Sequence, residues 1–551
     1  MNWRLRAVGV IGLVVLLSPR LRGEEAAEEP PPVPQGVEVL ARGPVHEAFA
    51  PATTDPVPTK PVPKQPPKAL EELPPAEKPE GNVVWIAGYW AWDDERNDFL
   101  WVSGVWRSPP AGKRWVAGYW RQDGTSWQWV PGFWAAEAKD EAKQEVVYLP
   151  APPAAPEVAP PGQPPNAESF YVPGHWEWTG SGYAWRAGYW ARVQPGYVWV
   201  PAHYRWTPSG YVFVAGYWDL PLAARGVIYA PVIVDPAVVT ATFVYTPTYV
   251  VRETVVVDSL FVRPCTCHYY FGDYYSVTYR DLGFESAIIY SRRHYEPIVV
   301  YQRYEYRHVP DWERTQVNIF IDRSEGRAPR PPRTLVQQNV VVKNVTNVTN
   351  VNQTIVNNPT TINQVNVQNN QVLVPASKWA AEKGTRTVPL DSAARSEAKQ
   401  QAQTVQKVSA ERKQTEAAAA PSQLTQPRKV ALDVPKTQPV AARTPAADKP
   451  NKPATTRPPA EKAPVKPAEA AKPPAKPTPP RGAGPHPPTD PKVKPAEPPS
   501  KPGEVRPTKP PEVRPAPPGS QRPPVPPPAT KPPPPSDKDK DKKKKPADPR
   551  M

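Results

Sequence analysis

Cysteine is scarce in this chain of 551 residues, which contains only Cys265 and Cys267. Together with His268, which follows directly, the pair supplies too few ligands for a metal site, and the other histidines are not spaced as in a zinc signature. We therefore expect no metal. Two interpretations of the C-x-C pair remain open: a local disulfide between Cys265 and Cys267, or two free thiols.

Catalytic motifs are missing as well. The chain contains no G-x-S-x-G, no H-E-x-x-H and no phosphate-binding loop, so no enzyme site emerges from its motifs. The acidic cluster Asp93, Asp94 and Glu95 falls in an expected turn, where solvated charge is the ordinary explanation. We expect neither catalytic activity nor a bound cofactor.

Long apolar runs are limited to one short segment near the N-terminus. Residues 7–17 are apolar, follow Arg4 and Arg6, and precede acidic sequence that begins at Glu24. This order is typical of a secretory signal peptide, which we place at residues 1–23. The run is too short to span a bilayer well. We expect an exported protein (secreted, periplasmic or at the cell surface) with no transmembrane span after signal removal.

Proline, by contrast, is abundant. The chain has 85 prolines and a mean hydropathy of −0.60, so much of it is expected to bury no core. Residues 24–81 are rich in Pro, Glu, Lys and Ala, and residues 136–168 are rich in Pro, Ala and Glu. We expect both segments to be extended, disordered linkers.

An aromatic repeat between Trp85 and Trp218 is the most informative feature of the chain. Each copy has an aromatic at position i, a small residue or proline at i+2, glycine at i+3 and an aromatic at i+5. Only Ala202 departs from the glycine rule. The copies read WIAGYW, WVSGVW, WVAGYW, WVPGFW, YVPGHW, WRAGYW, WVPAHY and FVAGYW, and they begin at Trp85, Trp101, Trp115, Trp129, Tyr171, Trp185, Trp199 and Phe213. Whatever the folded part does, we therefore expect it to depend on aromatic side chains repeated at a fixed interval.

The spacing of the copies predicts β-hairpins. In the second group of four, the copies begin 14 residues apart and their details alternate every 28 residues. A strand and a turn fill 14 residues, so 28 residues make one hairpin, and the sequences TGSG and TPSG lie where turns are needed. We expect two blocks of four antiparallel strands, block 1 at residues 82–135 and block 2 at residues 169–219.

The repeated glycine has two interpretations. Aromatics five residues apart point to opposite faces of a regular strand, and a bulge at a glycine with positive φ would bring them to one face. Alternatively, the glycine makes room for a neighbouring indole. Under either interpretation the sequence predicts an aromatic antiparallel sheet.

The motif also suggests a family. The WxxGxW copies, preceded by tyrosine in YAWR at residues 183–186 and YVWV at residues 197–200, resemble those of the bacterial YXWGXW (WXXGXW) repeat proteins. The resemblance covers about a quarter of the chain. It implies an envelope location, a β-rich repeat and no established activity, so no site residues can be carried over from it.

The sequence after the repeats falls into three parts before the tail. Residues 220–335 are rich in Tyr, Val and Ile, which predicts further strands, and the tyrosine-rich centre at residues 268–275 is either a ligand site or a set of core aromatics. Residues 336–375 form an Asn/Val/Thr-rich tract, which is either stacked strands or disordered. Residues 376–420 include a polar helix candidate from Asp391 to Ala419 that lacks a broad apolar stripe, so we expect a solvated helix.

The C-terminal segment carries the net charge. Residues 421–551 contain 27 Lys and Arg against 12 Asp and Glu, and this difference of +15 equals the net charge of the whole chain. The same segment contains 41 prolines. We expect a disordered basic tail that either binds polyanions through counterion release or serves as a solubilising spacer.

Two functions follow from these features. The first is a structural or scaffolding protein of the cell envelope, in which aromatic β-hairpins form a rigid module and the cationic tail acts as a tether. The alternative is a module that binds wall polysaccharide or peptidoglycan through exposed aromatic faces. Expected partners are cell-wall glycan, another envelope polyanion or envelope proteins, without specific nucleic-acid recognition. The candidate binding surface comprises Trp85, Trp90, Trp101, Trp106, Trp115, Trp120, Trp129, Trp134, Trp176, Trp185, Trp190, Trp199 and Trp218.

Overall fold

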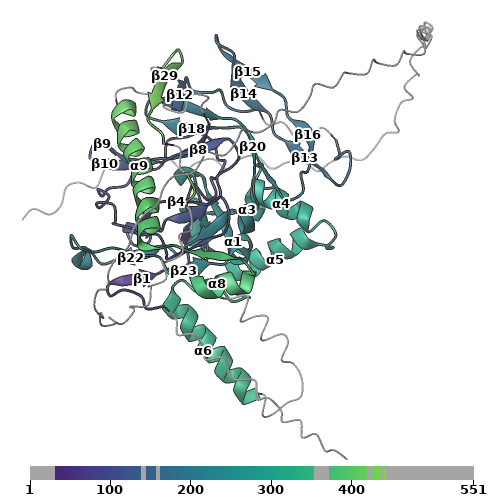
Figure 1. Cartoon of the computed structure of the whole chain (residues 1–551). Helices are drawn as coiled ribbons and strands as arrows, with labels where there is room; N and C mark the ends of the chain where they lie inside the picture. Colours follow the sequence, from purple (N-terminus) through teal and green to yellow (C-terminus); the bar gives the residue numbers. More distant parts are fainter. Residues whose placement is uncertain are drawn as a thin grey trace, which may run out of the picture. The chain divides into compact units, whose positions relative to one another are not determined.

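The computed structural model describes residues 31–137, 144–156, 162–352, 371–417, 424–435 and 438–440. All of them belong to one unit, which ends at Asn451. The expected signal peptide and most of the expected basic tail lie outside the described residues. The fold is mostly β and is built on antiparallel hairpins, as the repeat predicts (Figure 1).

The eight repeat copies form four hairpins, two in each block. Every copy is a strand divided into two short strands by the residues at i+2 and i+3. We call the hairpins 1 (residues 84–107), 2 (113–136), 3 (169–192) and 4 (198–219). Their strands are β4 (Val84–Ile86), β5 (Tyr89–Asp93), β6 (Asp98–Val102) and β7 (Val105–Arg107); β8 (Lys113–Val116), β9 (Tyr119–Asp123), β10 (Ser126–Val130) and β11 (Phe133–Ala136); β13 (Ser169–Val172), β14 (His175–Trp178), β15 (Tyr183–Arg186) and β16 (Tyr189–Arg192); and β17 (Val198–Val200), β18 (His203–Thr207), β19 (Gly210–Val214) and β20 (Tyr217–Asp219).

The interruption in each hairpin is symmetric. In hairpin 1, Ile86 pairs with Val105 before it and Tyr89 pairs with Val102 after it, so two residues face two residues and the register is unchanged. A bulge would leave one strand a residue longer. None of the seven glycines at i+3 has a positive φ. The bulge interpretation is therefore wrong, and we call each interruption a gap.

The expectation that the i and i+5 aromatics of one strand lie on the same face of the sheet depended on the bulge. Each i aromatic packs against the i+5 aromatic of the facing strand, edge-on in six of the eight pairs, as Trp85 does on Trp106 and Trp101 does on Trp90. Trp85 and Trp90, the i and i+5 aromatics of one strand, belong to different core clusters. The expectation that such pairs share a face is thus wrong in hairpin 1.

Segments from outside the repeats complete the sheets. The sheet orders are β1-β22-β6-β5, β21-β7-β4, β18-β19-β12-β29 and β2-β25-β24-β26, with the pairs β23-β27 and β28-β3. The added strands are β1 (Val37–Val39), β2 (Gly43–Pro44), β3 (Glu77–Pro79), β12 (Gln144–Leu149), β21 (Gly226–Ile228), β22 (Val232–Val234), β23 (Tyr249–Val251), β24 (Leu260–Arg263), β25 (His268–Phe271), β26 (Glu285–Ser286), β27 (Leu373–Pro375), β28 (Thr387–Pro389) and β29 (Arg428–Leu432).

This assembly corrects three boundaries drawn from composition. Residues 31–81 are not an extended linker, because Val45, Ala48 and Phe49 are fully buried in the main core. Part of the second expected linker forms β12, which pairs with β19 and β29. Strand β29 lies inside the segment expected to be a disordered tail. Proline is compatible with these extended segments, which cross the hairpins instead of standing apart from them.

Helices follow the repeats. They are α1 (Glu253–Asp258), α2 (Val277–Asp281), α3 (Ala287–Tyr290), α4 (Pro297–Glu305), α5 (Trp312–Ser324), α6 (Leu335–Asn352), α8 (Ala376–Lys383) and α9 (Ser392–Glu416). Residues 220–335 are thus mixed, not all strand, and the start of the Asn/Val/Thr-rich tract is helical. Within the described residues, no helix combines the length and the apolar composition needed to cross a membrane.

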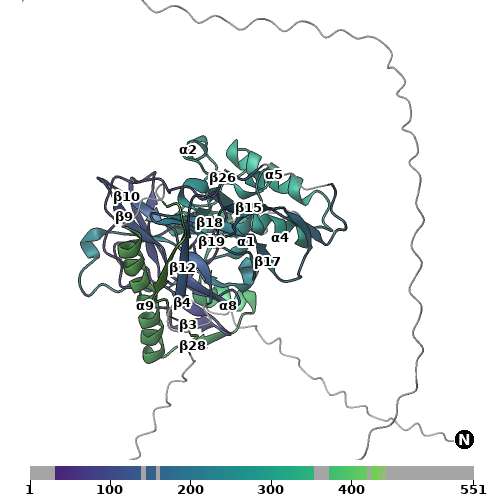
Figure 2. The ribbon, with the colours of Figure 1, turned by 90° about the horizontal axis from the view of Figure 1, so that it is seen from above.

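Helix α9 packs against the repeats and is not a solvated helix. Asp391 caps it, accepting a hydrogen bond from the Ala394 amide at 2.7 Å, as the sequence predicts. One stripe of the helix is buried: Ala394, Ala398, Ala402, Val405, Val408, Arg412 and Glu416. It contacts β4, β8 and β9 (Figures 1 and 2). Alanine lets the helix approach the sheet closely, so a narrow stripe of small residues suffices for packing, and the lack of a broad apolar stripe did not indicate a solvated helix.

We predict that Ala398→Leu destabilises the protein, because the added side chain has no room between α9 and the strands. Overpacking of this kind costs about 1–3 kcal/mol. Ala410→Leu is the matched control, since Ala410 is an exposed alanine of the same helix, and it should change stability by less than about 0.5 kcal/mol. Urea unfolding followed by far-UV circular dichroism measures both variants. Equal stability of the two would contradict the packed position of the helix.

Candidate functional site

The glycines at i+3 leave room for the facing aromatic ring. A Cβ atom built on Gly104 would lie 2.5 Å from the Trp85 ring, and one on Gly118 would lie 2.5 Å from the Trp129 ring. Such distances are far inside van der Waals contact, so no larger residue fits unless the ring moves. The interpretation that glycine makes room for an indole is confirmed.

The gap of hairpin 1 holds a buried carboxylate. Glu72 accepts hydrogen bonds from the amides of Gly88 and Gly104, each at 3.0 Å, and from Trp101 Nε1 at 3.1 Å. The amides at i+3 have no ladder partner at the gap, and a buried unpaired amide is costly. A glutamate from the proline-rich segment 31–81 therefore completes this hairpin.

The gap of hairpin 2 repeats this arrangement with Glu47. Its carboxylate accepts from the Gly132 amide at 3.1 Å and from Trp129 Nε1 at 3.2 Å. The carbonyl groups at i+2 are satisfied by helix α9, whose Arg412 donates to the Ala117 oxygen at 2.7 Å. The gap is thus held by the Glu47 carboxyl group at the Gly132 amide and by the Arg412 guanidinium at the Ala117 carbonyl group.

Burial dominates the ionisation of the two glutamates. It raises the pKa of Glu72 from 4.5 to about 7, although the amides of Gly104 and Gly88 and the Trp101 indole act in the opposite direction. Burial likewise raises the pKa of Glu47 to about 7, against the lowering effect of its bonds from Gly132 and Trp129. Both groups therefore titrate near neutral pH.

Comparison with known protein families gives one match, described as the WXXGXW repeat. It covers residues 82–107, 114–135, 170–191 and 195–218, which are the four hairpins. The chain contains WXXGXW repeats. Comparison with curated proteins and with solved structures gives no match. The match defines the WXXGXW hairpins and assigns no activity to them.

Burial divides the candidate WXXGXW binding surface between the two blocks. In block 1 the tryptophans are core residues, except Trp120, which is half-buried; the buried set is Trp85, Trp90, Trp101, Trp106, Trp115, Trp129 and Trp134. In block 2 all candidates are half-buried: Trp176, Trp185, Trp190, Trp199 and Trp218. The binding surface expected over both blocks therefore does not exist in block 1, where the indoles interdigitate.

Hairpin 3 is the most exposed WXXGXW hairpin. It extends from the unit beside α4 (Figure 1). Tyr189 has 55% of its surface exposed. Pairs of rings cross the hairpin, with Trp176 packed edge-on against Trp185 and Tyr171 against Trp190. This hairpin is where the WXXGXW aromatics can meet a partner.

His46 and His268 lie beside Glu47, and their contacts serve the packing of the core. Tyr89 stacks on Trp129, and its hydroxyl lies 2.9 Å from His268 Nε2. Burial lowers the pKa of His268, and that of His46 nearby, to about 4, so both rings are neutral at physiological pH. Within the described residues, no three His, Cys, Asp or Glu side chains gather as metal ligands do.

The two cysteines are free thiols, so the disulfide interpretation is wrong. Cys267 is buried with a left-handed backbone (φ +57°), and its sulfur accepts a hydrogen bond from Thr54 Oγ1 at 3.6 Å. Burial raises the pKa of the Cys267 thiol, which lowers the thiolate fraction and with it the reactivity.

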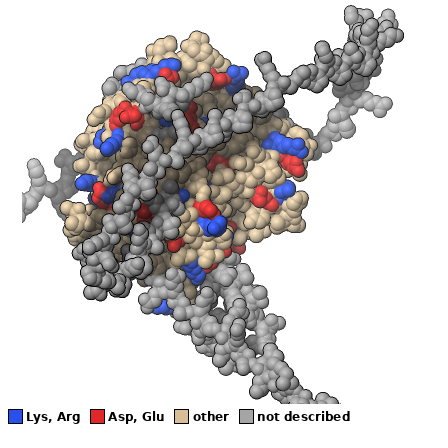
Figure 3. Space-filling model, viewed as in Figure 1, with Lys and Arg blue, Asp and Glu red and all other residues tan. Residues whose placement is uncertain are grey.

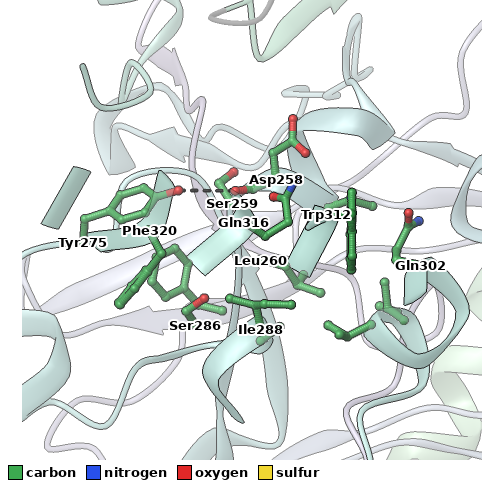
Figure 4. A pocket seen from close by; sticks show the side chains of 15 residues that line it. Asp258, Ser259, Leu260, Tyr275, Ser286, Ile288, Gln302, Trp312, Gln316 and Phe320 are labelled. Carbon is green, nitrogen blue, oxygen red and sulfur yellow. Dashed lines mark hydrogen bonds between the residues drawn. The ribbon is translucent and has the colours of Figure 1, made fainter. Parts of the chain in front are cut away.

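A large cavity lies between α2, α3 and α5. It has a volume of about 640 Å³, and Val277, Ile289 and Phe320 are among its lining residues. Tyr274 and Tyr275 also line it, so the tyrosine-rich centre combines a core cluster with one cavity wall. A neighbouring cavity of about 30 Å³, shown in Figure 4, has room for little more than water.

No sequence motif includes Glu47 or Glu72. Both are single acidic residues in proline-rich sequence, where composition alone suggests solvated charge. The acidic cluster expected to be solvated is also partly buried, because Asp94 forms an ion pair of 2.6 Å with buried Arg263. Only the gap glycines, which leave amides unpaired, point to a need for such partners.

We predict that Gly104→Ala destabilises the protein by at least about 2 kcal/mol, because its Cβ would meet the Trp85 ring, Glu72 and the Ile86 carbonyl oxygen within 2.7 Å. Gly182→Ala is the control, since a Cβ there has no heavy atom within 4 Å. Thermal unfolding of both variants measures the difference. A Gly104→Ala protein as stable as Gly182→Ala would show that the ring does not need the space.

We also predict that Glu72 makes the free energy of unfolding depend on pH. Its folded pKa of about 7 lies above the ordinary 4.5, so its contribution is fully present below pH 4.5 and is lost as the pH rises through 7. The expected loss is on the order of 3 kcal/mol. Urea unfolding of wild type and Glu72→Gln across this range isolates the effect, because other titrating groups are shared. A wild-type advantage that stays flat or grows with pH would contradict it.

Proposed function

We propose that this WXXGXW repeat protein is an exported structural component of the cell envelope. The described unit serves as a rigid β-rich body, and the basic C-terminal segment serves as a tether. The observation that carries the proposal is the burial of the block 1 aromatics: Trp101 and Trp106 are fully buried. Rings that form the core hold hairpins together and are unavailable to a ligand. The proposal includes no catalytic step.

The charge distribution supports a separate tether. On the face of the unit seen in Figure 3, acidic and basic side chains are interspersed among uncharged ones. The net charge of +15 is carried by residues 421–551 in the sequence. Electrostatic attraction to anionic wall polymers or lipid headgroups would therefore come from the tether and not from the hairpins.

Glycan binding is the second candidate, and hairpin 3 is the observation that favours it. Its half-buried tryptophans and the exposed Tyr189 present apolar ring faces of the kind that pack on sugars. This function would use one hairpin instead of the whole repeat array. It would not depend on net charge.

We predict that deleting residues 452–551 abolishes retention on anionic wall polymer and leaves the thermal transition unchanged. The deletion removes most of the basic residues and keeps β29, which a cut at residue 421 would remove. Retention of the full chain should fall steeply between about 0.05 and 0.3 M salt, because the contacts are electrostatic. Co-sedimentation measures retention, and calorimetry measures the transition.

Uncharged chitin and cellulose distinguish the two candidates in the same assay. Retention on them that survives deletion and high salt, and that Tyr189→Ala removes, would favour glycan binding by hairpin 3. Retention of the truncated protein on anionic polymer would instead contradict the tether.

A further inference from the structure

The gap of hairpin 3 has the same construction as the two filled gaps. Gly174 and Gly188 occupy the glycine positions, and Trp185 occupies the position held by Trp101 in hairpin 1 and Trp129 in hairpin 2. A Cβ on Gly174 would lie 2.5 Å from the Trp185 ring. The Gly174 and Gly188 amides and the Trp185 indole N–H therefore lie around the gap of hairpin 3, where they can donate hydrogen bonds to one acceptor group.

No carboxylate of the described chain fills this third gap. Glutamate oxygens are among the three atoms nearest to a Cβ on Gly104, Gly118 and Gly132, whereas those nearest to Gly188 are the hydroxyl oxygen and a ring carbon of Tyr171 and the Val172 carbonyl oxygen. Among the described residues, no side chain accepts a hydrogen bond from the Gly174 or Gly188 amide, in contrast to Gly88 and Gly104. Nor does any described residue accept a hydrogen bond from Trp185 Nε1. The donors that bind a glutamate in hairpins 1 and 2 stand open in hairpin 3.

Hairpin 4 provides an internal contrast. Ala202 replaces one gap glycine, and Phe213, which has no N–H, stands where the donating tryptophan would be. Its gap has lost the indole donor, although Ala202 and Gly216 keep their amides, and no described glutamate binds there. Hairpin 3 thus keeps all three donors without an occupant among the described residues.

The third gap is reachable from solvent. Gly174, Gly188 and Trp185 are half-buried, in the hairpin that extends from the unit (Figure 1). The side chain of Arg186, next to Trp185, is 63% exposed and forms an ion pair with Glu177, so it adds no net charge. The three N–H donors are what favours a carboxylate.

The two filled gaps show what kind of segment fits. Glu47 lies between Pro44 and Pro51, and Glu72 directly precedes Leu73, Pro74 and Pro75. Neither glutamate belongs to a named helix or strand. We propose that the gap of hairpin 3 binds the glutamate side chain of an extended, proline-flanked segment of a partner chain, through the Gly174 and Gly188 amides and the Trp185 indole N–H.

A peptide taken from this chain tests the proposal. The probe is residues 69–76, ALEELPPA, whose Glu72 fills the gap of hairpin 1, and the control peptide carries Glu72→Gln. Binding of the labelled peptides to the full-length protein is followed by fluorescence anisotropy at about 0.3 M salt, where attraction to the basic tail is screened. We expect saturable binding of the glutamate peptide and at least tenfold weaker binding of the glutamine peptide.

Protein variants locate the site. Trp185→Phe keeps the ring and removes the N–H, so it should weaken binding about tenfold, as loss of a hydrogen bond to a charged group does. Trp199→Phe in hairpin 4 is the matched control and should bind as wild type does. In a ¹⁵N–¹H spectrum, the indole resonance absent from Trp185→Phe should shift on addition of the peptide to wild type.

Three outcomes would overturn the proposal: no saturable binding, equal affinity for the two peptides, or full affinity of Trp185→Phe. Acetate in excess should compete with the glutamate peptide. Binding that acetate leaves unchanged would show that the prolines, and not the carboxylate, are recognised. Because the tail takes no part, these outcomes are independent of the tether assay.

Discussion

A buried hairpin with an interrupted ladder must find partners for the backbone groups that the interruption frees. Each buried amide or carbonyl left unpaired costs about 1–3 kcal/mol, and every gap frees several of them. In hairpins 1 and 2 these partners are Glu72, Glu47 and Arg412. The rest of the unit depends on this requirement, because it fixes the path of residues 31–81 and the position of α9.

Two ion pairs are fully buried by the same packing. Arg107 in β7 and Asp219 in β20 are fully buried and lie 2.6 Å apart, and Arg225 approaches the same carboxylate at 3.2 Å. The pair joins hairpin 1 to hairpin 4, which belong to different blocks. Arg412 and Glu416 in α9 form a second fully buried pair, and Glu416 accepts hydrogen bonds from Tyr119 and Tyr148. Polar contacts of this kind fix which hairpin packs where, since a misplaced partner would leave an isolated buried charge.

Local sequence predicted the hairpins and the ends of helix α9 because both depend on neighbouring residues. The 28-residue period, the turn at Gly180 and the cap at Asp391 are of this kind. The helix α4 was predicted as strand from its Val and Tyr content. Helix α4 begins at Pro297, a residue favoured in the first turn of a helix. The Glu296 side chain caps this helix by accepting a hydrogen bond from the Val299 amide at 2.6 Å.

The contacts between segments could not be predicted, because the sequence of one segment contains no signal that identifies the distant segment it contacts. The sequence around Glu47 and Glu72 has the composition of a linker, and its burial depends on donors at Gly132 and Gly104, far along the chain. The candidate tryptophans were identified by type, but their burial is set by segments 31–81 and α9 that cover block 1. Hairpin 3 has the same motif without that cover, so its rings stay half-exposed.

The role of a WXXGXW copy is therefore decided by what fills its gap and covers its rings. With a glutamate in the gap and a helix or strand against it, the hairpin becomes core, as in block 1. With Ala202 at one glycine position and Phe213 in place of the donating tryptophan, hairpin 4 stays within its sheet through β19 and β12. Hairpin 3 keeps the three donors, has no occupant among the described residues and packs against hairpin 4 with its tryptophans half-buried. A repeat that serves as core where the chain supplies the carboxylate becomes a docking surface where another molecule must supply it.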